Sequence, residues 1–143
     1  MIYWDSSALI PLLIEEPHSQ LVKEIIRKDL EVVTWWGSLL ECLSAVSRRR
    51  REGILSHDEE DDLRQRLETA FETWTEIEPG EELRRSAGLL LFRHPLRSAD
   101  SLQLAAALTW VAKDPHGHQF VCLDGRLRDA ARNEGFKVLP EKT

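Results

Sequence analysis

Short apolar runs alternate along the chain with longer runs in which apolar residues recur every three or four positions. The short runs predict β-strands, at residues 2–4, 31–34, 75–77, 120–123 and 136–139. The longer runs predict amphipathic helices, of which the first follows Ser6 or Ser7 and the others cover residues 18–27, 38–51, 56–73, 82–93, 98–113 and 126–133. Strands separated by helices imply an α/β fold, in which a parallel sheet carries helices on both faces.

Local signals define several of the helix ends. Ser6 or Ser7 can cap the first helix through its side-chain oxygen, and Pro11 fits near the first turn of that helix. Ser56 and Glu59 have the spacing of a capping box, which predicts the start of the long helix that follows them.

The chain of 143 residues is long enough for one hydrophobic core, and no linker, repeat or low-complexity tract divides it. We therefore expect a single domain over residues 1–143. The composition, 42% hydrophobic and 31% charged, is that of a soluble globular protein, and no apolar stretch approaches the roughly 20 residues of a membrane-spanning helix. No basic segment precedes the first apolar run, so we expect no export signal, no membrane partner and a cytoplasmic location.

Four acidic residues border or interrupt the apolar runs. Asp5 ends the first predicted strand, Asp124 ends the apolar run at 119–123, Asp100 opens an apolar helix, and Glu41 lies inside another. Removing an unpaired carboxylate from water is costly, and several carboxylates close together repel one another. If the fold brings the four together, a bound hard divalent cation is the simplest explanation of their placement.

The expected sheet places two of these acids at one edge. Ligands of parallel α/β sheets bind beyond the carboxyl ends of the strands, and Asp5 and Asp124 both lie at such ends. Glu41 and Asp100 would reach the same edge from helices. Taken singly, Asp100 and Asp124 have an ordinary explanation as acids at a helix start, whereas Glu41 in the middle of a helix does not.

The net charge and the Cys and His residues exclude other kinds of site. A net charge of −6 argues against a general nucleic-acid coat protein but is compatible with a nuclease. Cys42 and Cys122 lie in apolar segments without a CxxC spacing, so we expect buried, unpaired thiols. His116 and His118 lie in a polar loop and lack the companions of a zinc site.

The four acids lie in segments whose order and spacing are informative together. The segments are YWDSSAL at residues 3–9, TWWGSLLECLSAVSR at 34–48, LRSADSLQLA at 96–105 and VCLDGRL at 121–127. Over essentially the whole chain they resemble the PIN-domain family, in particular the VapC-type ribonuclease toxins of prokaryotic toxin–antitoxin pairs. The resemblance implies a three-layer α/β/α sandwich, RNA as substrate, cleavage dependent on Mg²⁺ or Mn²⁺, a cognate protein antitoxin and a homodimer.

The resemblance also assigns catalytic roles to the acids. The acidic positions of the family fall on Asp5, Glu41, Asp100 and Asp124. Asp5, Asp100 and Asp124 are predicted to bind the metal directly or through water, while Glu41 completes the ligand shell or orients the attacking water. Whether one or two metal ions act stays open.

Four further positions of the motifs concern support and substrate preference. Ser6 matches a small polar residue after the first Asp, and Ser98 matches a Ser or Thr before the third. Either hydroxyl could position water or phosphate, cap a helix, or do both. Ser101 and Gln103 stand where many relatives have Ala and His, and neither difference removes an acidic ligand.

Arginines and tryptophans are candidates for RNA contact. Arg97, beside the third acid, is predicted to hold a phosphate, with Arg126 and Arg128 as weaker candidates. Arg48 opens a run of four arginines that is either an RNA contact or a solvated helix end. The pair at residues 35–36 is Trp-Trp, which stacks on a base in one interpretation and packs in a core or subunit contact in the other.

Two alternatives to a nuclease remain open. A receiver-like signalling domain also gathers acids at the end of a parallel sheet, but it needs a Lys at the end of a later strand, and Lys137 is poorly placed for that role. A catalytically silent binding module of the same fold is the second alternative, although all four acids are present.

Overall fold

A five-stranded parallel sheet forms the centre of the computed structural model, which describes all residues from Met1 to Thr143. Its strands are β1 (Ile2–Trp4), β2 (Val32–Trp35), β3 (Thr75–Ile77), β4 (Gln119–Val121) and β5 (Lys137–Leu139). They lie in the order β3-β2-β1-β4-β5, and every neighbouring pair is parallel. The predicted α/β fold with a central parallel sheet is therefore confirmed.

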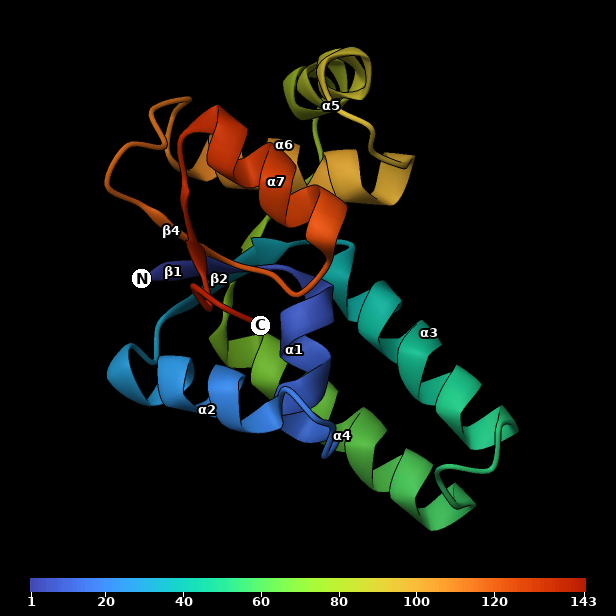
Figure 1. Ribbon diagram of the computed structural model, residues 1–143. Coiled ribbons are helices and arrows are strands. Elements are labelled where there is room, and N and C mark those ends of the chain that lie inside the picture. The colour runs from blue at the N-terminus through green and yellow to red at the C-terminus, as the bar shows by residue number, and fades with distance from the viewer.

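Helices cover both faces of the sheet. They are α1 (Ser6–Leu13), α2 (Ser19–Lys28), α3 (Ser38–Arg51), α4 (His57–Thr73), α5 (Glu81–Arg93), α6 (Ser98–Trp110) and α7 (Gly125–Glu134). Figure 1 shows α1 to α4 below the sheet and α5 to α7 above it, which makes the three layers of an α/β/α sandwich. None of the helices combines the length and the apolarity needed to cross a bilayer.

Two hydrophobic cores fill the spaces between the sheet and the helix layers. Successive side chains of a strand point to opposite faces, so β1, β2, β4 and β5 contribute to both cores. Tyr3 and Val33 are buried in the core beside α5, α6 and α7, while Ile2, Trp4 and Val32 are buried in the core beside α1 to α4. The near-continuous apolar strands seen in the sequence are a consequence of this burial on both faces.

The order of the strands reverses next to β1. The chain adds β2 and β3 on one side of β1 and then returns to add β4 and β5 on its other side. A crevice opens at the carboxyl ends of the strands where such a reversal occurs. The backbone N–H of Asp5 donates to the carbonyl of Val121 at 2.9 Å, so the ends of β1 and β4 are joined at this point.

Most predicted helix and strand ends are correct to within a residue or two, and three predictions need correction. The helix predicted to reach residue 113 ends at Trp110, because Ala112 and Lys113 adopt left-handed backbone with φ of 52° and 65°. Strand β4 ends at Val121 rather than at residue 123. Pro11 lies in the second turn of α1, and that helix ends at Leu13.

Of two helix caps predicted from the sequence, one is present in the structure and the other is not. The capping box of Ser56 and Glu59 is formed in both directions, as predicted. The first helix is capped by Asp5, whose carboxylate accepts from the backbone N–H of Ser7 at 3.1 Å, so the prediction of a serine cap at Ser6 or Ser7 is wrong. A carboxylate directly after a strand is as good an N-cap as a serine. Here the helix begins at Ser6, so Asp5 occupies the cap position.

Candidate active site

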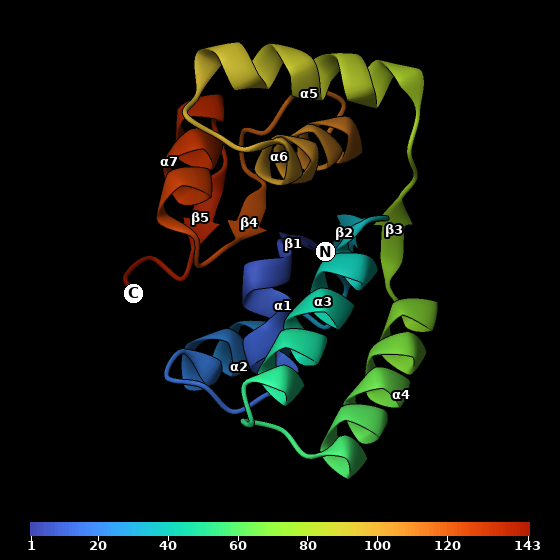
Figure 2. The same cartoon turned by 90° about the vertical axis from the view of Figure 1, so that its right-hand side faces the viewer.

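One cavity of about 530 Å³ is lined by all four of the acids singled out in the sequence. They reach it from separate elements: Asp5 follows β1, Glu41 lies in α3, Asp100 lies in the first turn of α6, and Asp124 precedes α7. The cavity is at the carboxyl edge of the sheet, which faces the viewer in Figure 2. The strand reversal beside β1 explains the meeting of Asp5 and Asp124, which are 119 positions apart in sequence.

Asp5 is the most deeply buried of the four acids, with 4% of its surface exposed. Its carboxylate accepts hydrogen bonds from the backbone N–H of Ser7 at 3.1 Å and from the Ser7 hydroxyl at 2.5 Å. Burial raises the pKa of Asp5 to about 6 and the charge of Asp100 adds to the rise, whereas the hydrogen bonds from Ser7 oppose it. Asp5 is therefore both the cap of α1 and a desolvated acid of the cavity.

Glu41 is held by two side chains from different helices. The hydroxyl of Ser6 donates to one carboxylate oxygen at 3.1 Å, and the amide of Gln103 donates to the other at 3.0 Å. Burial raises the pKa of Glu41 to about 7, and the charges of Asp5 and Asp100 contribute to the rise. The predicted supporting residue Ser6 thus contacts one of the acids and lines the cavity itself.

Asp100 and Asp124 form the other side of the acidic group. Burial raises the pKa of Asp100, and the nearby charge of Asp124 raises it further. Asp124 caps α7 by accepting from the backbone N–H of Leu127 at 3.0 Å. The ordinary explanation of Asp124 as a helix cap therefore holds together with its place in the cavity.

The donor chemistry of the cavity fits a hard divalent cation. Its four carboxylates offer only oxygen, and three of them have a raised pKa because of burial and the neighbouring negative charges. No group of three or more His, Cys, Asp or Glu side chains is close enough together to hold a metal ion as the side chains stand. Asp5, Glu41 and Asp124 each accept a hydrogen bond from a donor of their own.

The candidate arginines divide into two groups. Arg48 lines the cavity, and the charges of Arg97 and Arg126 are near enough to Asp100 to oppose the rise of its pKa. Arg128 is different: it is 6% exposed and donates to the carbonyls of Cys122 and Pro140, both at 2.7 Å. The weak prediction that Arg128 contacts RNA is therefore wrong, because its guanidinium is buried and donates to backbone carbonyls of the same chain.

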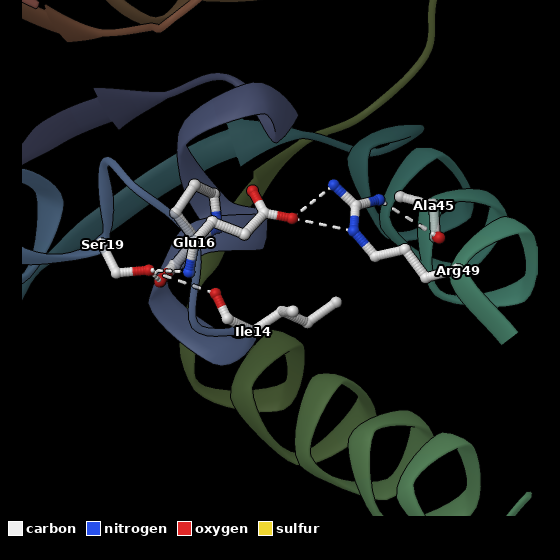
Figure 3. A network of polar contacts seen from close by, with 6 residues as sticks. Ile14, Glu16, Ser19, Ala45 and Arg49 are labelled. Carbon is white, nitrogen blue, oxygen red and sulfur yellow. Dashed lines mark hydrogen bonds and ion pairs between the residues drawn. The ribbon is translucent and has the colours of Figure 1, made fainter. Parts of the chain in front are cut away.

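In the arginine run of α3, too, some arginines are paired within the chain and one lies at the cavity. Figure 3 shows Arg49 reaching back to Glu16 and to the carbonyl of Ala45, and the Nε of Arg49 lies 2.8 Å from the carboxylate of Glu16. Arg50 pairs with Glu60 at 3.1 Å. Only Arg48 of this run lines the cavity, because consecutive residues of a helix point in different directions.

Other candidates lie outside the cavity or in a core. Ser98 is exposed at the first position of α6 and is not among the residues that line the cavity; the cap position belongs to Arg97, so the predicted serine cap is absent. Trp35 is buried in the core beside α5, α6 and α7, and Trp36 is 53% exposed. Core packing is thus the correct interpretation for Trp35.

Three residues close to the acids were not singled out as site residues from the sequence. Ser7 and Cys122 both contact the carboxylate of Asp5, and Gln103 contacts Glu41. Burial raises the pKa of Cys42 and of Cys122, so both thiols are inert and unpaired, as predicted. A signal for Gln103 existed in the sequence, because a polar amide among apolar residues of a helix needs partners once it is buried.

The fold and the cavity agree with the sequence comparisons. The family model of the PIN domain matches residues 2–133, and the chain belongs to the PIN-domain family. Over 140 aligned residues it is 28% identical to two proteins of Mycobacterium tuberculosis, ribonuclease VapC45 of strain CDC 1551 / Oshkosh and ribonuclease VapC49 of strain ATCC 25618 / H37Rv. The alignment covers 98% of this chain and 95% of each relative. The resemblance stated from the sequence is thereby confirmed.

The raised pKa values predict how stability depends on pH. An acid whose pKa is raised by folding stabilises the protein at low pH and loses that contribution as the pH rises through its value in the folded state. For Asp5 and Glu41 this loss falls between about pH 4 and pH 7. Asp5→Asn keeps a capping oxygen but carries no charge, so at pH 8 without metal it is expected to raise the free energy of unfolding by about 3 kcal/mol.

Chemical denaturation at pH 4 and pH 8 measures this effect. The gain is expected to vanish at pH 4, where Asp5 is already neutral. Asp61→Asn, which removes an exposed carboxylate of α4 outside the cavity, is the control and should show no such gain. Equal stability of Asp5→Asn and the unchanged protein at pH 8 contradicts the prediction.

Proposed function

We propose that residues 1–143 form a single metal-dependent endoribonuclease domain that hydrolyses RNA phosphodiester bonds as the toxin of a toxin–antitoxin pair. Membership of the PIN-domain family and the names of its two ribonuclease relatives support this proposal. The observation that carries it is the single cavity that four acids and Arg48 line from four separate stretches of chain. Such a set of charges suits a cation and a phosphate, and no apolar ligand.

The acids have distinct tasks in this proposal. Mg²⁺ or Mn²⁺, when bound, makes a water molecule more acidic and neutralises charge on a phosphate oxygen. Asp5, Asp100 and Asp124 supply oxygen ligands, directly or through water. Glu41 either completes the set or accepts a proton from the attacking water, a role for which a pKa of about 7 is well matched near neutral pH.

The arginines complement the acids by binding the RNA backbone. A phosphodiester brings its own negative charge into a cavity that is already acidic, so basic side chains must offset the repulsion. Arg48 lines the cavity, and Arg97 and Arg126 lie near Asp100. A guanidinium donates two parallel hydrogen bonds to a phosphate, which holds the backbone in register with the reacting bond.

The first test of this function is cleavage of RNA by the purified chain. Cleavage is expected with Mg²⁺ or Mn²⁺ and is expected to stop with a chelator. Asp100→Asn should lower the rate by at least about 100-fold, because it removes a charged oxygen ligand from the cavity. Asp114→Asn, an exposed loop position far from the cavity lining, is the matched control and should keep the rate. Metal-independent cleavage, or equal rates for the two variants, would refute the proposal.

A second test separates RNA binding from chemistry. Arg48→Met keeps the aliphatic bulk at the cavity wall but removes the charge, so we expect KM for RNA to rise by about threefold to tenfold with a smaller change in kcat. Arg64→Met, on the exposed surface of α4, is the control. Steady-state kinetics at several salt concentrations measures both, and an unchanged KM for Arg48→Met removes this residue from the binding site.

The partners of the toxin remain part of the proposal. We expect a protein antitoxin whose segment covers the acidic cavity, and a homodimer of the chain itself. Exposed apolar side chains of α5, Leu89 at 62% and Phe92 at 92%, are surface that a pair of chains would bury. Light scattering on the purified chain measures its mass, and growth arrest that is relieved by a small protein encoded beside the gene tests the antitoxin.

The alternatives from the sequence have less support. Lys137 begins β5 and therefore lies at the amino edge of the sheet, opposite to the acids, so a receiver-like phosphorylation site lacks its lysine. A silent binding module is compatible with the same fold. It differs from the nuclease in the cleavage experiment, where a silent module would leave RNA intact at every metal concentration.

A further inference from the structure

Gln103 is buried one turn after Asp100 on α6, with 1% of its surface exposed, and the mechanism above leaves it without a role. Its amide nitrogen donates to Glu41 Oε1 at 3.0 Å and to Ser38 Oγ at 2.9 Å. Its amide oxygen accepts from the hydroxyl of Tyr3 at 2.6 Å. The side chain therefore connects α6 with α3 and with the central strand β1.

The partners of Gln103 fix the direction of its amide group. An amide has nearly the same outline when its oxygen and nitrogen are exchanged, so the neighbouring donors and acceptors determine its orientation. A charged carboxylate only accepts, so the end that faces ionised Glu41 is the NH₂ group. The amide oxygen then faces Tyr3, whose hydroxyl must donate. The hydrogen bonds from Tyr3 through Gln103 to Glu41 consequently have a single direction, which ends on the carboxylate.

The far end of this chain of hydrogen bonds is anchored in the core. Tyr3 is fully buried in the middle strand, and its ring stacks on Phe120 of β4 with the centroids 5.0 Å apart. The Ser38 hydroxyl, the other acceptor of the Gln103 amide, lies 2.7 Å from the buried hydroxyl of Thr34 in β2. The position of the Gln103 amide is thus set by residues that cannot move without disturbing the sheet.

The opposite side of the Glu41 carboxylate is held less firmly. There the contact is with Ser6, a partly exposed residue of the cavity wall, at 3.1 Å. The side chain of Glu has three rotatable bonds, and the ordering of such a side chain costs free energy when a cation binds. A ligand that is already oriented by an outer residue binds its metal more tightly than a freely rotating one.

We infer that Gln103 is a positioning residue, which together with Tyr3 holds the Glu41 carboxylate at the cavity in readiness for a divalent cation. The inference rests on the proposed metal-dependent function. It adds to that function a specific source of metal affinity, which lies outside the acidic residues themselves and is built from neutral hydrogen bonds.

Calorimetric titration of the full chain with Mn²⁺, in the absence of RNA, tests the inference. Gln103→Met has a similar volume but cannot donate, and it is expected to weaken Mn²⁺ binding by about tenfold or more. Tyr3→Phe removes one oxygen and leaves the amide free to turn, so a loss of about threefold is expected. Ser101→Ala is the matched control: this serine is equally buried on α6, but its hydroxyl donates only to the carbonyl of Ser98, and Mn²⁺ affinity should stay unchanged.

The double variant Tyr3→Phe/Gln103→Met distinguishes positioning from general loosening of the core. If Tyr3 acts on Glu41 only through Gln103, the double variant binds Mn²⁺ no more weakly than Gln103→Met alone. If the losses of Mn²⁺ affinity in the two single variants multiply in the double variant, Tyr3 acts independently of Gln103, and its role in positioning Glu41 through Gln103 is refuted. Mn²⁺ affinity of Gln103→Met equal to that of Ser101→Ala overturns the inference altogether. If Gln103→Met does not fold, the Mn²⁺ affinity of Tyr3→Phe is compared with that of Ser101→Ala instead, and equal affinities overturn the inference.

One further variant separates this inference from the function on which it rests. If Asp5→Asn binds Mn²⁺ as tightly as the unchanged chain, the proposed metal site fails and the role of Gln103 fails with it. If Asp5→Asn loses Mn²⁺ binding while Gln103→Met keeps it, the metal site stands and only the positioning role is refuted.

Discussion

Desolvation of carboxylates that lie close together is the constraint around which this structure is arranged. Asp5, Glu41 and Asp100 all have a raised pKa, first because of burial and then because of one another or of Asp124. A fold gains no stability from such a cluster, and two extensive hydrophobic cores must outweigh it. The positions of neighbouring donors follow from the same constraint, since each hydrogen bond to a carboxylate lowers the cost of keeping it charged and buried.

Two of the acids both cap a helix and line the cavity. Asp5 caps α1 and Asp124 caps α7, and both line the cavity. The reason is geometric: the first turn of a helix that follows a strand offers free N–H groups at the carboxyl edge of the sheet, where the cavity also lies. A substitution at either position therefore changes helix stability and cavity charge together. Substitution by Asn separates the two, because the amide oxygen can still cap.

Pairing, rather than position in a basic run, decides which arginines are free to meet a substrate. Arg49 and Arg50 are bound to acids of the same chain, and Arg128 is enclosed by backbone carbonyls. Arg48 and Arg97 remain near the cavity or its acids. The negative net charge and the local positive charge are thus compatible, since the distribution of charges around the cavity matters more for binding than their sum.

The sequence by itself determined the elements and the candidate acids. The short apolar runs of the strands, the helical recurrence of apolar residues, the capping box at Ser56 and the isolation of Glu41 in an apolar helix are local patterns, and each is expressed in the fold. The tertiary structure alone decided that Asp5 is the cap, that Ser98 stays outside the cavity, that Arg128 is buried and that Gln103 holds Glu41. These outcomes depend on hydrogen bonds and burial between residues far apart in the chain, and periodicity along a single segment contains no information about them.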